Sequence, residues 1–201
     1  MSASQPLPLL LASSSPRRRE LLARAGLHFE VRPAQIDEAP LPRETPSALV
    51  ARLADAKALD VARQTGTTPA RVVLGADTIV VLDDCVLGKP VSEAHAEEML
   101  GRLMGRTHRV ITGVAIARSD TLELWRASVE SRVSMRMADR EEIRAYVASG
   151  ESQDKAGAYA VQGEGRRFIE RIEGSETNVI GLPLDETLEL LRAAGVAVHL
   201  P

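Results

Sequence analysis

The chain of 201 residues can form one large domain or two small ones, and its 44% hydrophobic and 26% charged residues are ordinary for a soluble globular protein. A net charge of −3 and only 2% aromatic residues argue against a nucleic-acid-binding surface, which needs a basic excess and stacking side chains. The one cysteine, Cys85, excludes an internal disulfide, and no apolar run is long enough to span a membrane, so we expect a cytoplasmic protein without a membrane partner.

Apolar and amphipathic runs alternate along the chain, and their periods predict an alternation of strands and helices. In chain order we expect a strand over 7–12, a helix over 15–26, a strand over 28–32, a helix over 45–66, a β-rich stretch over 71–90, a helix over 92–105, two or three strands over 107–137, a helix over 139–150, a strand over 166–174 and a helix over 183–195. Ser15, Thr45 and Ser92 stand where N-cap residues are expected. The pairs Asp83–Asp84 and Ser119–Asp120 are predicted to lie in turns between strands.

This order of elements indicates an α/β fold around a mixed sheet. The strands after Thr107 have hairpin-length connections, which favour antiparallel pairing, whereas the earlier strands alternate with helices. No linker rich in Pro, Gly or Ser divides the chain, and there is no internal repeat or low-complexity tract. We therefore expect a single domain over residues 1–201.

The stretch from Ser13 to Arg19 places three serines, a proline and three arginines between a predicted strand and a predicted helix. A helix N-terminus has unpaired N–H donors and the positive end of the macrodipole, so it favours anions. Serine hydroxyls add donors, and an arginine presents a planar fork that fits phosphate oxygens. The stretch thus predicts a phosphate site, although it is not a P-loop motif. The alternative is a capped surface helix with a solvated basic turn.

Asp77 interrupts an otherwise apolar strand, where an unpaired carboxylate would be costly. Metal ligation, general-base work or a salt bridge would explain it, and the neighbouring Gly75 would let a ligand approach the backbone. Lys89, between Gly88 and Pro90, is expected to occupy a tight turn that aims its ammonium inward. The alternative is a strand-end acid that caps a loop, together with a surface lysine.

Three further charged positions are open to interpretation. Lys57 lies in a predicted helix, where periodicity alone predicts a solvated lysine. Asp37 and Glu38 form an acidic pair in a predicted loop, and most such pairs are solvated. Together with Asp77 they have the chemistry to hold Mg²⁺, which takes one or two carboxylates and leaves other positions to water and phosphate.

Residues 154–165 alternate small residues with polar anchors, which predicts an ordered loop beside a pocket. Gln162 has an amide that can read both donor and acceptor edges of a nucleobase. The alternative for this loop is a turn-rich connection without a binding role. Elsewhere in the chain, Cys85 is interpreted as a packing residue. The residues alone favour a nucleotide enzyme over a binding module, but they do not indicate which reaction it catalyses.

Several long motifs, in order, resemble one known family. They are "LASSSPRRRELL", "RLADAKA", "VLGADTIVVLDDCVLGKP", "THRVITGVAIA" and "DKAGAYAVQGEGRRFIERIEGSETNVIGLPL". Together they closely resemble the Maf family of nucleoside triphosphate pyrophosphatases, from about Leu9 to the last predicted helix. The resemblance implies hydrolysis between the α- and β-phosphates with a divalent metal, Mg²⁺ or Mn²⁺. It also implies an elongated mixed sheet flanked by helices, two lobes with the nucleotide in a central cleft, and a homodimer.

The resemblance also implies roles for particular residues. Ser13, Arg17 and Arg18 match the phosphate-loop motif. The positions that match the family's catalytic and phosphate-binding residues are Glu38, Lys57, Asp77 and Lys89. Among these, Asp77 matches the usual proton acceptor, and Glu38 and Asp77 are the expected metal ligands.

Three positions further resemble the branch of the family that acts on dTTP and UTP, namely Arg17, Thr78 and Gln162. The branch that acts on 7-methyl-GTP typically has tryptophan, glutamine and glutamate there. We therefore expect dTTP and UTP as substrates, with 7-methyl-GTP or another modified nucleotide as the alternative. One departure is Gln153, where a proline-bearing form of the motif is frequent. A different class of function also stays open, that of a cell-division or septum-formation regulator that acts by binding a partner.

Overall fold

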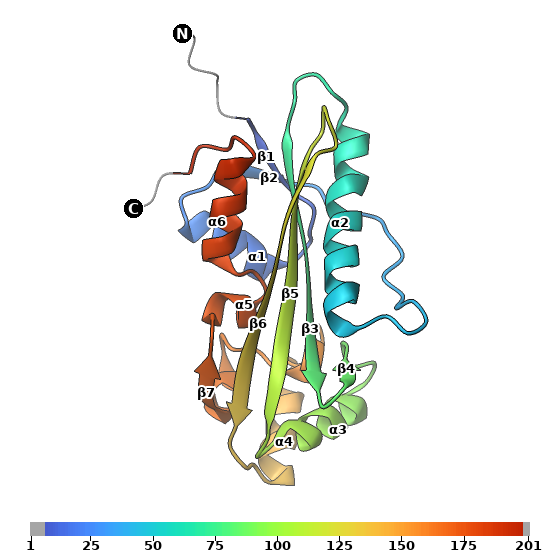
Figure 1. Cartoon of the computed structure of the whole chain (residues 1–201). Coiled ribbons are helices and arrows are strands. Elements are labelled where there is room, and N and C mark those ends of the chain that lie inside the picture. Colours follow the sequence, from blue (N-terminus) through green and yellow to red (C-terminus); the bar gives the residue numbers. More distant parts are fainter. Residues whose placement is uncertain (1–6, 199–201) are drawn as a thin grey trace. The chain divides into compact units, whose positions relative to one another are not determined.

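The computed structural model describes residues 7–198, which fold into helices and strands around one mixed sheet (Figure 1). The strands are β1 (Leu9–Leu11), β2 (Phe29–Val31), β3 (Val72–Leu82), β4 (Cys85–Leu87), β5 (Thr107–Arg118), β6 (Leu124–Met135) and β7 (Ile169–Glu173). The α-helices are α1 (Pro16–Arg24), α2 (Pro46–Thr65), α3 (Glu93–Leu103), α4 (Arg140–Ala148), α5 (Glu176–Ile180) and α6 (Leu184–Ala193), and two short 3-10 helices are η1 (Ala156–Ala158) and η2 (Glu164–Phe168).

The predicted helix starts are confirmed by their capping hydrogen bonds. Ser15, Thr45 and Ser92 each accept a bond from the backbone N–H three residues later, at 3.4, 3.3 and 3.1 Å. Such a bond satisfies one of the N–H donors that a helix start leaves unpaired. The local sequence therefore determines where α1, α2 and α3 begin.

The structure departs from the sequence predictions in three local features. The last strand begins at Ile169 rather than at residue 166, because residues 164–168 wind into η2. Helix α5 was not predicted, since five residues between Gly174 and Gly181 are too short to show a helical period. Cys85 was expected to pack, but it is exposed in the short strand after the β3–β4 turn.

The sheet has the strand order β2-β1-β3-β5-β6-β7, with β4 paired to β3. Strand β1 runs parallel to β2 and to β3, whereas the pairs β3–β4 and β6–β7 are antiparallel. This mixture confirms the predicted α/β class with a mixed sheet flanked by helices. No helix within residues 7–198 is long and apolar enough to cross a membrane.

The chain divides into two compact units. The first unit comprises the chain up to Asp77, residues 112–128 and the chain from Gly181, and the second comprises residues 78–111 and 129–180. Strands β3, β5 and β6 each contribute residues to both units.

In the first unit, α2 covers one face of the sheet, while α1 and α6 lie on the other side (Figure 1). Strand and helix residues share one buried apolar cluster, which contains Leu10, Ala12, Val73, Ala115 and Ala117 from the strands and Ala54, Ala58, Val61 and Ala62 from α2. Since successive strand residues point to opposite faces, the buried Leu9 and Leu11 point toward the side of α1 and α6.

Gly75 determines how closely β3 approaches α2. A Cβ at this position would lie 2.4 Å from the carbonyl oxygen of Ala54 and 2.6 Å from the nitrogen of Ala58. Any side chain would therefore push the strand away from the helix. The expectation that Gly75 admits a ligand was wrong, because the helix backbone occupies that space.

In the second unit, α3 packs against α4 and η1. Tyr146 and Phe168 are fully buried and meet edge to face, with ring centroids 5.4 Å apart. His108 is only 2% exposed and lies 2.7 Å, through its Nε2, from the hydroxyl of Tyr159. Burial lowers the pKa of His108 to about 4.

This buried histidine predicts a loss of stability at mildly acidic pH. The unfolded chain binds a proton at His108 near pH 6.5, whereas the folded chain does so only near pH 4. The unfolded state therefore gains protons first as the pH falls, which lowers the free energy of unfolding by about 2 kcal/mol at pH 5. Urea unfolding at pH 7.5 and pH 5 measures this loss, and His108→Gln should reduce it by that amount. Equal pH dependence in both proteins would contradict the assignment.

Candidate functional site in the first unit

The loop before α1 is folded onto its own hydroxyl groups. The buried Ser13 accepts hydrogen bonds at its Oγ from the Ser15 N–H and from Nη1 of Arg18, both at 3.2 Å. Nε of Arg18 donates to the carbonyl oxygen of Gly181 at 2.8 Å. Arg18 therefore fastens the serine loop to the segment before α6, a contact across 163 residues that no local pattern could have indicated.

The charge at the start of α1 is opposite to the usual preference. Helices favour acidic side chains in the first turn, but α1 has none there, and Arg17, Arg18 and Arg19 follow directly after Pro16. Burial lowers the pKa of Arg18, the negative charge of Asp77 opposes that shift, and a guanidinium remains charged in proteins. Positive side chains thus adjoin the positive end of the helix dipole, an arrangement that a bound anion would relieve.

An acid–lysine cluster, formed by Lys57, Asp77 and Glu38, lies in the same unit. Nζ of Lys57 is 2.7 Å from Oδ1 of Asp77 and 2.8 Å from Oε1 of Glu38. The side chains of Lys57 and Asp77 are each only 11% exposed, whereas that of Glu38 is 57% exposed. The cluster joins a buried ion pair to a carboxylate that reaches in from the surface.

The prediction of a solvated Lys57 was wrong. The lysine is on the buried face of α2, three residues after Ala54 and four before Val61. It therefore continues the apolar stripe, and a charged residue in such a stripe needs a partner, which Asp77 provides. The spacing was visible in the sequence, but the partner was 20 residues away on another element.

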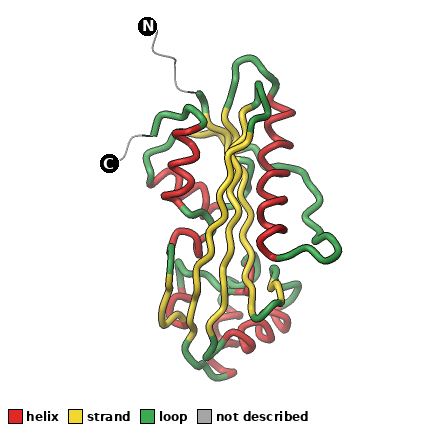
Figure 2. Tube along the Cα trace, in the orientation of Figure 1, coloured by secondary structure: helices red, strands yellow, loops and turns green. Residues whose placement is uncertain are grey.

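The loop that carries Glu38 leads into α2 (Figure 2), and an arginine of α2 holds it. Arg52 donates to both carboxylate oxygens of Glu44, at 2.6 and 2.8 Å, and to the carbonyl oxygen of Ala39 at 3.0 Å. The hydrogen bond from Arg52 lowers the pKa of Glu44 to about 2. Asp37, the other half of the predicted acidic pair, accepts from the Ala39 N–H at 2.9 Å and shapes the turn. Arg52 and Glu44 were not predicted, because no short-range sequence pattern links them to Glu38.

The remaining predicted site residues belong to the second unit. Thr78 directly follows Asp77 in β3 and is half-buried, and Gln162 is half-buried in the turn between η1 and η2. Lys89 is exposed, and the direction of its ammonium stays a prediction. The carbonyl oxygen of the preceding Gly88 accepts from the Gly157 N–H at 3.1 Å, which joins this turn to η1.

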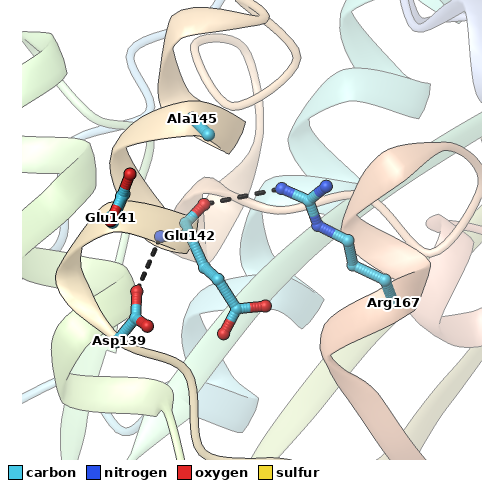
Figure 3. Close-up of a pocket in the computed structure, with 5 residues that line it drawn as sticks. All are labelled: Asp139, Glu141, Glu142, Ala145 and Arg167. Atoms are coloured by element: carbon cyan, nitrogen blue, oxygen red, sulfur yellow. Dashed lines mark hydrogen bonds between the residues drawn. The ribbon is translucent and has the colours of Figure 1, made fainter.

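A separate shallow pocket of about 260 Å³ in the second unit contains none of the predicted site residues (Figure 3). Its lining residues are Asp139, Glu141, Glu142, Ala145 and Arg167. Asp139 caps α4 by accepting from the Glu142 N–H at 2.9 Å, and Arg136 binds the Glu142 carboxylate at 2.7 Å. Three carboxylates beside one lining arginine would repel a triphosphate. We assign this pocket no role in catalysis.

The carboxylates of Asp77 and Glu38 fit a divalent cation that also binds phosphate. Both converge on Nζ of Lys57, so both line one place. Within the described part of the chain, no group of three or more His, Cys, Asp and Glu could hold a metal ion. Two carboxylates are nevertheless what Mg²⁺ typically takes from a protein when substrate phosphate supplies further ligands.

The ion pair predicts a large effect of removing its cation. Lys57→Met leaves the Asp77 carboxylate buried without a cation, which should lower the free energy of unfolding by about 3 kcal/mol. Urea unfolding at neutral pH measures the change. The double variant Lys57→Met/Asp77→Asn should recover part of it, because the uncompensated charge is gone.

The exposed Lys89 supplies the matched control for this experiment. Lys89→Met removes the same charge from the surface and should change stability by less than about 0.5 kcal/mol. A Lys57→Met protein as stable as the Lys89→Met protein would show that water screens the pair of Lys57 and Asp77.

Comparisons with known proteins confirm the family that the sequence motifs resemble. The family model described as "Maf-like protein" matches residues 8–194. A dTTP/UTP pyrophosphatase of Methylococcus capsulatus is 50% identical over 194 residues, which is 96% of this chain and 94% of the relative. A protein of the same name from Moorella thermoacetica is 50% identical over 94% of this chain and 96% of its own length. Another, from Geotalea uraniireducens, is 48% identical over 93% of this chain and 95% of its own length. A family match over almost the whole chain, together with relatives of this identity, shows that the chain belongs to the Maf family.

Proposed function

We propose that this protein is a nucleoside triphosphate pyrophosphatase that hydrolyses dTTP and UTP to the monophosphate and pyrophosphate. The full-length relatives that carry this name support the substrate assignment. The observation that carries the proposal is the buried ion pair of Lys57 and Asp77, with Glu38 on the same ammonium. Such a pair is a costly arrangement for stability alone and is typical of a reaction centre.

In this proposal, each member of the acid–lysine cluster has a role. Water attacks the α-phosphorus, the bond between this phosphorus and the bridging oxygen breaks, and pyrophosphate leaves. Asp77 accepts the proton of the attacking water, and Lys57 holds the Asp77 carboxylate in position. Their low exposure keeps bulk water away from the proton acceptor and strengthens the electrostatic interactions there.

The phosphate chain carries several negative charges, which basic side chains neutralise. Ser13, Arg17 and Arg18 would bind phosphate oxygens at the start of α1, where the helix dipole adds to their effect. Lys89, exposed in its turn, would contribute a further ammonium. Since Arg18 is buried and bonded to Ser13 and Gly181, it would also keep this loop in one conformation.

Glu38 and Asp77 would hold a divalent cation, Mg²⁺ or Mn²⁺, together with the substrate phosphates. The cation would neutralise the charge on the phosphate oxygens. Arg52 would keep Glu38 available for this task, because it binds the Ala39 carbonyl next to Glu38.

Arg17, Thr78 and Gln162 would select the base, in line with the branch of the family that acts on dTTP and UTP. The two compact units would act as one catalytic domain over residues 1–201, in keeping with a family model that matches continuously from residue 8 to residue 194. The central cleft, the homodimer and the cytoplasmic location stay predictions from the sequence.

The first test is release of pyrophosphate from a panel of nucleoside triphosphates with Mg²⁺ or Mn²⁺. We expect release from dTTP and UTP, and a loss of about 10²- to 10⁴-fold in kcat for Asp77→Asn, because the amide cannot accept the proton. Activity on 7-methyl-GTP alone would keep the reaction and overturn the substrate assignment. No release from any nucleotide would contradict the enzyme and favour the partner-binding alternative.

A second prediction concerns the base. Gln162→Glu replaces an amide donor by a carboxylate, which cannot donate to a uracil carbonyl but attracts the cationic ring of 7-methylguanine. We expect kcat/KM for UTP to fall by about 10-fold or more and the ratio of 7-methyl-GTP to UTP turnover to rise. Steady-state assays on both nucleotides measure this change. Unaltered preference would contradict the assignment of Gln162.

A further inference from the structure

The carboxylate of Glu151 collects hydrogen bonds from the segment that follows Gln162. Its Oε2 accepts from the Glu164 N–H at 2.9 Å, and its Oε1 accepts from the Gly165 N–H at 3.0 Å. The hydroxyl of Tyr146 donates to the same Oε1 at 2.9 Å. One half-buried carboxylate thus holds the two backbone groups at the start of η2 and a tyrosine of α4.

Tyr146 extends this contact to the residues before Gln162. Its hydroxyl accepts from the Ala160 N–H at 3.2 Å while it donates to Glu151. The ring of Tyr146 is fully buried and packs edge to face on Phe168. The pair of Glu151 and Tyr146, named the carboxylate–phenol bridge below, therefore binds the backbone on both sides of Gln162.

Two glycines allow the backbone to come this close to the bridge. Gly163 has a φ of 127°, and a Cβ on it would lie 2.2 Å from Oε2 of Glu151. A Cβ on Gly165 would lie 2.8 Å from the hydroxyl of Tyr146. The left-handed φ of Gly163 disfavours any side chain there, and a Cβ on Gly165 would also lie 2.6 Å from the carbonyl oxygen of Ala160, so both glycines of the "QGEG" stretch serve this close approach.

The electrostatics of Glu151 agree with its role as an acceptor. Burial acts to raise the pKa of Glu151, but the hydrogen bonds from Gly165, Glu164 and Tyr146 outweigh it together, and the pKa lies below its usual value. At neutral pH the side chain is therefore a carboxylate that only accepts hydrogen bonds. Glu151 is therefore a charged acceptor of hydrogen bonds from the backbone that follows Gln162.

We propose that Glu151 and Tyr146 are positioning residues that determine base selectivity by holding Gln162 in place. This inference rests on the proposed function, in which Gln162 reads the base. The amide of a glutamine carries both a donor and an acceptor, so its discrimination between uracil and cytosine depends on where the backbone places it against the edge of the base. A backbone tied on both sides limits where the amide can lie, and discrimination follows from that limit.

The test is a graded series of variants that weaken the bridge without touching Gln162. Glu151→Ala removes the acceptor of three hydrogen bonds, Glu151→Gln retains one oxygen acceptor, and Tyr146→Phe removes a single hydroxyl. In the metal-supplied enzyme, we expect the UTP-to-CTP ratio of kcat/KM to fall by about 10-fold for Glu151→Ala and by smaller factors for the other two. The loss should reside in KM for UTP, with kcat little changed, because Asp77, Lys57 and Glu38 belong to the other unit.

Glu164→Gln is the matched control, since it makes the same charge change on an exposed side chain in the same segment. It should keep the selectivity of the parent protein. Equal losses on every nucleotide, or an unchanged ratio in a folded Glu151→Ala protein, would overturn the inference. If thermal unfolding shows that neither Glu151 variant is folded, Tyr146→Phe provides the test instead. An unchanged UTP-to-CTP ratio of kcat/KM in that variant would also overturn the inference.

Hydrogen exchange gives a second readout that needs no substrate. The backbone amides of Glu164 and Gly165 should exchange about 10-fold faster in Glu151→Ala than in the parent protein, because both lose their acceptor. Unchanged exchange would overturn the inference even if activity falls. A parent protein that releases pyrophosphate from no nucleotide would contradict the proposed function itself, whereas a selective parent with equally selective bridge variants contradicts this inference alone.

Discussion

The first unit depends on the buried ion pair between Lys57 of α2 and Asp77 of β3. Burying two charges costs free energy. This cost is offset only when the two groups lie within hydrogen-bond distance and their remaining polar atoms also have hydrogen-bond partners. The close approach of β3 to α2 meets this condition, and Gly75 makes that approach possible because it lacks a Cβ. Helix, strand and glycine are thus one arrangement, and the carboxylate that it holds is the centre of the proposed chemistry.

Around this pair the chain places charge in arrangements that an unliganded protein would avoid. Arginines occupy the positive end of α1, and one of them is buried against Ser13 and Gly181. Two carboxylates share one ammonium, and Arg52 draws the loop of the second one against α2. The arginines at the start of α1 and the paired carboxylates cost stability in isolation and become favourable toward a polyanion with its cation. A stability–function trade-off of this kind is typical of active sites.

The sequence predicted most elements and the caps that begin them, because these depend on residues a few positions apart. Ser15, Thr45 and Ser92 bond to backbone groups three residues away, so their roles are local. Predictions failed where a side chain finds its partner far along the chain. Lys57 was interpreted as solvated because its partner Asp77 lies on another element. The role of Glu151 was not predicted, because it accepts these hydrogen bonds only once α4 and η2 are folded together.

The sequence by itself determined the α/β class, the helix starts and the membership of the Maf family. These follow from periodicity, capping and motif order, which survive in an extended chain. Only the tertiary structure decided which of the charged residues meet, which are buried and which backbone segments they hold. The physical reason is that an ion pair such as that of Lys57 and Asp77, or a bridge such as that of Glu151 and Tyr146, depends on distance and burial. Both quantities come into being only when elements distant in the chain pack together.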